Sequence, residues 1–454
     1  MMGGAHYLPA TEEDRKAMMA RIGIADVEEL FADIPAAIRL SEDLRLPPAL
    51  SELGLTTHMR KIAAQNLDVD SALCFLGAGS YDHFIPAVVS DLASRSEFTT
   101  AYTQYQAEIS QGALQALWEY QSMICELTGL DVANASLYDG ATALAEAMNM
   151  ACGATGRKKV LISAGIHPLY RRVLATYAYD LGIQIEVIPL VNGVTDKQAL
   201  LAAVNPETAG ILLQSPNFFG CIEDMGGIAE EIHRQGGLLV LAVNPISLGI
   251  LKPPGDYGAD IAVGEGQMLG LGLNFGGPYL GFMAVREKWM RRMPGRIVGR
   301  TVDKEGNRGF VLTLQAREQH IRREKAYSNI CSNEGLCALT AAIYLTAIGK
   351  QGLVNVATLC AEKAHYAAEQ ISALPGYSLE FSSPFFHEFV VRTPVPAKEL
   401  QTKLLSRRII SGLDLAGLDC GFSGDSCDRM LFCVTEKRTK EEIDHLVAVL
   451  GGEE

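Results

Sequence analysis

Apolar runs alternate with helical sequence through the middle of the chain. Four runs are predicted to be buried strands, at 160–162, 185–188, 211–213 and 238–241. Stretches of about a dozen residues with helical character separate them. Strands that alternate with crossover helices predict a mostly parallel sheet covered on both faces. The apolar segments 261–263 and 280–285 are expected to be further strands of this sheet.

Glycines mark the ends of the helices predicted on either side of this region. Apolar residues recur at helical spacing from Tyr105 to Leu127, and Gly129 is expected to end that helix. A later helix is predicted from Glu334 to Ile348 with Gly349 closing it, and a second one follows from about Val354 to Ile371. Strands are expected after these helices at 378–381, 386–392 and 430–434.

The length of the chain predicts more than one domain. At 454 residues it exceeds the size at which one hydrophobic core usually stops growing. Its N-terminal part begins with Thr11-Glu12-Glu13-Asp14, which puts acidic residues at a helix start, and continues as amphipathic helical sequence to about Pro35. We expect a helical arm over 1–65, a large α/β domain over 66–332 and a smaller C-terminal α+β domain over 333–454.

Composition places the chain among ordinary globular proteins and excludes several partners. A formal charge of −14 argues against nucleic acid or an anionic membrane surface. No apolar run reaches the roughly 18 residues that span a bilayer, and the start lacks the pattern of a secretory signal, so a cytoplasmic location is expected. The ten cysteines form no Cys-x-x-Cys pair, which favours buried thiols over disulfides or zinc, and no metal is expected.

One segment runs against the overall charge. Between Arg286 and Lys325 there are twelve Lys or Arg residues against five Asp or Glu residues, a local balance of +7. A solvated, arginine-rich loop and a docking surface for an acidic partner explain this equally well.

The predicted sheet invites a test for pyridoxal phosphate, because large parallel-sheet enzymes hold this cofactor on loops at the carboxyl ends of their strands. Such a site needs backbone donors for the phosphate, a stacking side chain, a carboxylate for the pyridine nitrogen and a lysine. Gly140, Ala141 and Thr142 follow a small-residue turn at a helix start, where free N–H groups face an anion, although a simple N-cap explains the turn as well. His167 is placed for stacking, with a histidine satisfied inside a loop as the alternative.

The two remaining requirements are not met. Asn244 follows the strand 240–243 where the carboxylate is expected, and an asparagine cannot carry that charge. Gln267 lies after the strand 261–263 where the lysine is expected, and its side chain has no amine. We therefore predict a cofactor-enzyme fold whose own pocket is vestigial.

Five longer motifs identify the family that this fold resembles. They lie at 75–86, 102–112, 126–136, 317–325 and 328–333, the first reading Phe-Leu-Gly-Ala-Gly-Ser-Tyr-Asp-His-Phe-Ile-Pro. Over essentially its whole length the chain resembles the alpha subunit of two-subunit bacterial glycine dehydrogenase (decarboxylating), the P-protein of the glycine cleavage system.

The resemblance implies a pyridoxal-phosphate-dependent transferase fold of type I and an alpha2beta2 enzyme. In that family the beta subunit carries the cofactor lysine, and this chain alone is expected to be inactive. The reaction implied is decarboxylation of glycine with transfer of the aminomethyl group to the lipoyl group of the H-protein.

The same resemblance suggests residues that support the partner's active site across the interface. They are Ser80, Asp82, His83, Tyr102, Tyr105, Gln106 and Glu108. For the tyrosines, simple packing at a subunit seam is the alternative. The sequence departs from the commoner family pattern at Gln104, where a proline is usual, which changes the stiffness of that turn.

Three other functions were weighed against this one. The glycines of the first motif lack the third glycine and the acidic residue of a dinucleotide loop. A free-standing enzyme that used Lys252 would need a different strand register. A purely structural or regulatory assembly subunit would also lack the lysine and the carboxylate, so it remains the alternative.

Overall fold

The computed structural model describes residues 9–40, 42, 44–101, 104–330, 333–419 and 427–452. The chain divides into two compact units, Met1–Leu67 and Asp68–Glu454. The predicted boundary between a large and a small domain at 332/333, which falls inside the second unit, stays a prediction.

The first unit consists of short helices without a core of their own. It holds α1 (Glu12–Ile22), α2 (Glu52–Ala63) and 3-10 turns at Val27–Phe31 and Ala36–Ile38. The predicted acidic helix start is present, because Thr11 and Asp14 form a reciprocal capping box. None of the described residues of these helices is buried. Their apolar side chains therefore gain little from packing within the unit.

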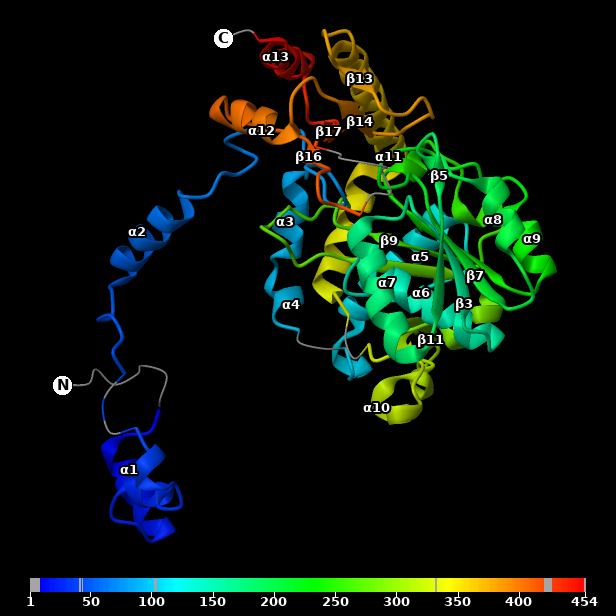
Figure 1. The fold of residues 1–454 in the computed structure, drawn as a ribbon. Helices are drawn as coiled ribbons and strands as arrows, with labels where there is room; N and C mark the ends of the chain where they lie inside the picture. Colours follow the sequence, from blue (N-terminus) through cyan, green and yellow to red (C-terminus); the bar gives the residue numbers. More distant parts are fainter. Residues whose placement is uncertain are drawn as a thin grey trace. The chain divides into compact units, whose positions relative to one another are not determined.

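A seven-stranded sheet organises the second unit (Figure 1). Its strands are β2 (Val132–Ala133), β3 (Lys159–Ser163), β4 (Gln184–Ile188), β7 (Thr208–Gln214), β8 (Leu238–Val243), β9 (Ile261–Glu265) and β10 (Gly281–Val285). They lie in the order β2-β10-β9-β8-β7-β3-β4. The run from β9 to β4 is parallel, while β10 pairs antiparallel with both β9 and β2. The mostly parallel sheet is therefore confirmed, with an antiparallel edge.

Helices cover both faces of this sheet, and the strand residues divide between them. The helices are α5 (Gln111–Thr128), α6 (Gly140–Thr155), α7 (Pro168–Leu181), α8 (Lys197–Ala203) and α9 (Ile228–Arg234). On one face Leu161 and Leu239 pack in a core with residues of α5 and α9. On the other, Val160 and Val240 pack with residues of α6 and α7. Alternate residues of a strand point to opposite faces, so strands covered on both sides read as continuous apolar runs.

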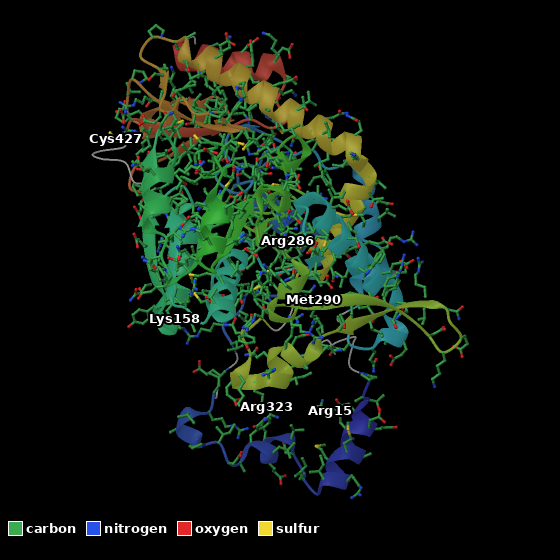
Figure 2. The ribbon with its side chains drawn as sticks, turned by 90° about the vertical axis from the view of Figure 1, so that its right-hand side faces the viewer. Arg15, Lys158, Arg286, Met290, Arg323 and Cys427 are labelled. Atoms are coloured by element: carbon green, nitrogen blue, oxygen red, sulfur yellow. The ribbon has the colours of Figure 1, made fainter. Side chains whose placement is uncertain are left out.

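One local prediction in this unit was wrong at its start, and the arginine-rich segment, which the sequence left open, has regular structure. The helix expected from Tyr105 begins at Gln111, because residues 107–109 form a separate 3-10 turn and Ile109 is exposed; its predicted end is correct, since Gly129 adopts the left-handed conformation. The arginine-rich segment is not a loop throughout. It contains an antiparallel hairpin of β11 (Ile297–Val302) and β12 (Arg308–Thr313), followed by the helix α10 (Gln319–Arg322). Arg323, the residue after this helix, is labelled in Figure 2.

The C-terminal elements gather at one end of the second unit (Figure 1). They are α11 (Gly335–Ser372), β13 (Ser378–Leu379), β14 (Glu388–Arg392), α12 (Ala397–Ser406), β15 (Ile409–Ile410), β16 (Leu413–Asp414), β17 (Arg429–Cys433) and α13 (Lys440–Gly451). A four-stranded sheet runs β13-β14-β17-β16, and β15 pairs parallel with β1 (Leu73–Cys74). The remaining short elements are α3 (Ala87–Ala93), α4 (Ser96–Thr99), β5 (Leu190–Val191) and β6 (Val194–Thr195).

The longest helix, α11, joins the two helices that were expected on either side of Gly349. That glycine has non-helical dihedral angles (φ 61°, ψ −178°), so the break was correctly placed, although the second helix follows without a gap. By length and composition α11 could cross a membrane, with a mean hydropathy of 1.3 in its most apolar window. Its first half packs in one core with α5 and its second half in another with α13, and 44% of that window is buried.

Candidate functional site

A small cavity lies where the parallel strands end, and of the residues predicted for the vestigial pocket His167 lines it. Its volume is about 40 Å³. Its lining residues are Gly79, Tyr81, His167, Tyr170, Gln214, Pro216, Ala242, Val243, Asn244, Gly264, Glu265, Met268, His387 and Glu388. A water molecule needs roughly 10–15 Å³ measured in this way, so the cavity has room for a few waters.

Gln267, at the position expected for a lysine, is buried and fully hydrogen-bonded. Its Oε1 accepts from the Tyr81 N–H at 2.9 Å, and its Nε2 donates to the carbonyls of Tyr81 at 3.1 Å and Leu271 at 2.8 Å. Both polar atoms of the amide are therefore used on main chain. Gln267 acts as a clamp on the first motif rather than as a reactive group.

Asn244, at the position expected for a carboxylate, also serves the backbone. Its Oδ1 accepts from the N–H groups of Ile246 at 2.9 Å and Ser247 at 3.3 Å, which caps the turn after β8. Its Nδ2 lies 3.5 Å from Nε2 of His387. Burial lowers the pKa of His387 well below its ordinary value, so its ring is neutral and accepts from the amide.

The predicted phosphate loop forms the N-terminus of α6, and the N–H groups of Gly140 and Thr142 are already engaged. Asp139 is the N-cap, and its Oδ1 accepts from Thr142 N and Oγ1, both at 2.7 Å. The Gly140 N–H donates to Oε2 of Glu265 at 3.0 Å. Ala141, between them, is buried.

Two buried carboxyls that the sequence did not suggest line this cavity. Glu265 accepts from the N–H groups of Gln267 and Leu280, both at 2.9 Å, besides Gly140. Glu388 accepts from Ala78 N at 2.6 Å and from the Tyr81 hydroxyl at 2.8 Å. Burial raises the pKa of each to about 7 against the opposing effect of these hydrogen bonds. The sequence signal was weak, since each is a single acid in an apolar strand.

His167 lies in the pocket wall, with its ring stacked on Tyr170 at a centroid distance of 4.9 Å. Its Nδ1 accepts from Leu169 N at 3.1 Å, which caps α7, and its Nε2 lies 2.9 Å from the Ala78 carbonyl. Both ring nitrogens are therefore engaged within the chain.

Asp82 and His83 of the first motif are buried against the C-terminal segment of the same unit. Asp82 pairs with Lys437 at 2.6 Å and Arg438 at 3.4 Å, and its carbonyl accepts from the Thr435 hydroxyl at 2.7 Å. Ser80, by contrast, is half-buried. The two charged candidates of this motif thus hold the chain's own segments together.

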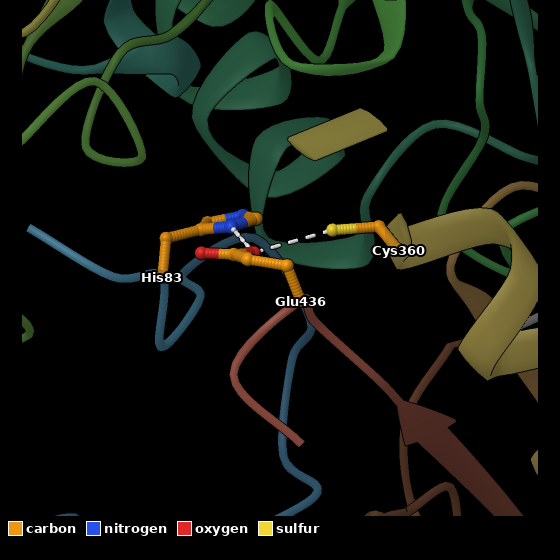
Figure 3. A group of neighbouring side chains, drawn as sticks. All are labelled: His83, Cys360 and Glu436. Atoms are coloured by element: carbon orange, nitrogen blue, oxygen red, sulfur yellow. Dashed lines mark hydrogen bonds and ion pairs between the residues drawn. The ribbon is translucent and has the colours of Figure 1, made fainter. Parts of the chain in front are cut away.

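His83 is part of a cluster with Cys360 and Glu436, which approach one another from three separate segments (Figure 3). His83 Nδ1 lies 2.6 Å from Glu436 Oε2, and the Cys360 thiol lies 3.3 Å from the same oxygen. Burial opposes ionisation of Glu436, but the hydrogen bond and charge of His83 lower its pKa to about 2. Burial raises the pKa of Cys360, so this side chain is a thiol that donates to Glu436. These are residue types that bind metals; here His83 Nδ1 and the Cys360 thiol both bond Glu436, while His83 Nε2 is buried without a hydrogen-bond partner among the described residues.

The candidates of the second motif lie on the surface. Tyr105 is 51% exposed; its hydroxyl accepts from Arg296 Nη2 at 2.5 Å, and its ring lies 4.5 Å from that guanidinium. Gln106 and Glu108 are exposed, while Tyr102 lies outside the described residues. The structure therefore separates the predicted set into internal residues, Asp82 and His83, and a surface strip at 105–108.

Comparisons with known sequences point to one family. The model of the glycine cleavage system P-protein matches residues 5–450. A probable glycine dehydrogenase (decarboxylating) subunit 1 of Desulfitobacterium hafniense is 57% identical over 446 residues, covering 98% of this chain and 99% of the relative. A probable subunit 1 from Moorella thermoacetica is 54% identical over 447 residues, with the same coverage.

Solved structures agree with this result. The chain superposes on a glycine decarboxylase (P-protein) of the glycine cleavage system, crystallised in inhibitor-bound form, with a TM-score of 0.91 and 46% identity; the match covers 98% of this chain and 99% of that one. At 15% identity, a sphingosine-1-phosphate lyase of Burkholderia pseudomallei shares the fold with a TM-score of 0.66, covering 92% of this chain and 94% of the lyase. The predicted fold class, a transferase fold of type I, is confirmed.

Proposed function

Because the chain belongs to the glycine cleavage system P-protein family, we propose that it acts as the alpha subunit of a two-subunit glycine dehydrogenase (decarboxylating). That enzyme is an oxidoreductase that decarboxylates glycine. In this proposal the pyridoxal phosphate belongs to the partner beta subunit, where it supplies the electron sink. The lipoyl group of the H-protein accepts the aminomethyl group.

One observation carries the assignment of this chain as the subunit without a cofactor. Gln267 replaces the required lysine, and its amide is committed to the main chain of Tyr81 and Leu271. Asn244 supplies no carboxylate, and the N–H of Gly140 already donates to Glu265. A cavity of about 40 Å³ is also far below the roughly 300 Å³ of even a small ligand pocket. The residues of this chain therefore do not fit the cofactor.

The surface supports a stable partner subunit. Fifteen of the thirty-five exposed large apolar side chains among the described residues belong to the first unit. None of the described helical residues of that unit is buried. Monomeric proteins rarely leave so much apolar surface uncovered. We propose that it is covered in an alpha2beta2 assembly, which works in the cytoplasm.

The surface strip at 105–108 is our candidate for direct support of the partner's site. The Tyr105 hydroxyl accepts a hydrogen bond from Arg296, and the guanidinium of the same arginine lies over the half-exposed ring, so both parts of the side chain are held in place. A group held in this way keeps its orientation at an interface and can position a polar substrate without moving. Gln106 and Glu108 extend the strip with an amide and a carboxylate. Ser80 stays a weaker candidate, since it is half-buried.

Reconstitution tests the proposal directly. This chain and its lysine-bearing partner would be purified separately and mixed, with the visible absorbance of the cofactor and the glycine-dependent exchange of carbon dioxide recorded for each sample. We expect this chain alone to be colourless and inactive, and the mixture to be yellow and active. If this chain alone bound the cofactor through a lysine, the placement of Gln267 would be wrong.

A further inference from the structure

The N-terminus of α6 meets a buried carboxyl group that comes from the chain itself. Glu265, the last residue of β9, points its carboxyl group at the first residue of this helix. Oε2 accepts from Gly140 N at 3.0 Å, and Oε1 accepts from Gln267 N and Leu280 N at 2.9 Å. The side chain is 92% buried. Three backbone donors and one helix N-terminus thus meet at one carboxylate.

This arrangement has the chemistry of a phosphate site. Helix N-termini bind anions because their first N–H groups have no partner within the helix and the helix dipole is positive there. Phosphate sites use such donors together with N–H groups of neighbouring loops. The geometry at Gly140 is also tight: an added Cβ would lie 3.0 Å from Glu265 Cβ and 2.5 Å from the Tyr170 hydroxyl. Any side chain on Gly140 would therefore collide with Tyr170 and Glu265, so the close approach of Glu265 to the helix start needs a glycine there.

We propose that the Glu265 carboxyl group is a built-in substitute for a cofactor phosphate: it occupies the position at the N-terminus of α6 where a phosphate would bind, and so prevents phosphate esters from binding there.

The contact between Asn244 and His387 also supports this proposal. In an enzyme of this fold the side chain at position 244 would face the cofactor ring, and here Asn244 faces the neutral ring of His387, with Nδ2 and Nε2 3.5 Å apart. Internal groups thus stand at the phosphate end and the ring end of the same pocket. The chain's own groups thus take the places of ligand groups at both ends of the pocket and leave a cavity of about 40 Å³ between them.

This inference rests on the proposed function in one respect, namely that the ligand excluded is a phosphate-bearing cofactor. The test uses inorganic phosphate and the full chain without a partner. Thermal unfolding is followed by tryptophan fluorescence, which reports on the second unit because Trp118 and Trp289 both lie there. The variants are Glu265→Ala, which empties the seat, and Glu265→Gln, which fills it without charge.

We expect a saturable rise in Tm with phosphate for Glu265→Ala, of about 3 °C once phosphate reaches about 100 times its dissociation constant. Wild type and Glu265→Gln should show only the change that sodium chloride of equal ionic strength produces. An equal response of the alanine and glutamine variants would overturn the proposal.

If Glu265→Ala does not accumulate as folded protein, refolding in phosphate and in chloride gives the same discrimination. Greater recovery in phosphate supports the inference, and equal recovery overturns it. Neither measurement involves turnover. An inactive mixture with the partner subunit would therefore count against the proposed function and leave this inference standing.

Discussion

Replacing Gln267 by methionine should destabilise the second unit strongly, although methionine has nearly the same length and volume. The glutamine amide makes three hydrogen bonds to main chain, to Tyr81 N, Tyr81 O and Leu271 O. It is 1% exposed, so water cannot replace these bonds. The Tyr81 carbonyl keeps a second donor, His83 N at 3.1 Å, so the substitution removes the partner of two buried backbone groups, Tyr81 N and Leu271 O. Each such group costs about 1–3 kcal/mol, which predicts a loss of about 2–6 kcal/mol for the two.

Urea unfolding followed by tryptophan fluorescence measures this loss for the second unit alone, since the first unit contains no tryptophan. Gln351→Met is the matched control, because Gln351 lies exposed on α11 and bonds only Asn355 of the same helix. The control should change the free energy of unfolding by less than about 0.5 kcal/mol. A loss below about 1 kcal/mol for Gln267→Met would refute the clamp.

Three further predictions concern pH and activity. The pKa of Glu265 in the folded protein, about 7, is above the ordinary value of 4.5, so its contribution to stability is complete below pH 4.5 and is lost as pH rises through 7. Glu265→Gln should remove up to about 3 kcal/mol of this pH dependence in urea titrations. The effect of Glu436 on stability has the opposite pH dependence. Its pKa in the folded protein is about 2, so its contribution to stability is present above pH 4.5 and is lost as pH falls towards 2. Glu436→Gln should therefore reduce the loss of stability at acid pH in the same titration. Tyr105→Phe should lower glycine-dependent carbon dioxide exchange about tenfold in the reconstituted enzyme, with assembly unchanged. Tyr179→Phe, at an exposed tyrosine, is the control and should leave the exchange rate unchanged. Equal rates for the two variants would leave only a packing role for the Tyr105 hydroxyl.

Local sequence determined most of the framework. Continuous apolar runs such as 238–241 predicted buried parallel strands, and Gly129 and Gly349 marked the helix breaks, because these features depend on each residue's own side chain and backbone preferences. The hairpin β11–β12 was not predicted, because it lacks such an apolar run. Most of β11 is exposed or partly exposed, so its strands carry no continuous apolar signal.

The identities of Gln267 and Asn244 were also visible in the sequence, and with them the absence of a lysine and a carboxylate at those two positions. What those residues do instead was not visible. Gln267 bonds the main chain of Tyr81, 186 positions away, and Glu388 bonds Ala78 across 310 positions. Asp82 and His83 contact the segment 435–438 of their own chain, and no local pattern predicted these contacts; their expected role at the partner's site stays a prediction.

The sequence by itself therefore determined the class of fold, the family that the chain resembles and which reactive groups are missing from the pocket. Only the tertiary structure decided that Glu265 and His387 line the pocket, and that the buried carboxylate of Asp82 is paired with Lys437 and Arg438 of the same chain. The physical reason is that a side chain's chemistry belongs to the residue, whereas its burial and its hydrogen-bond partners depend on residues that the fold brings together from distant parts of the chain.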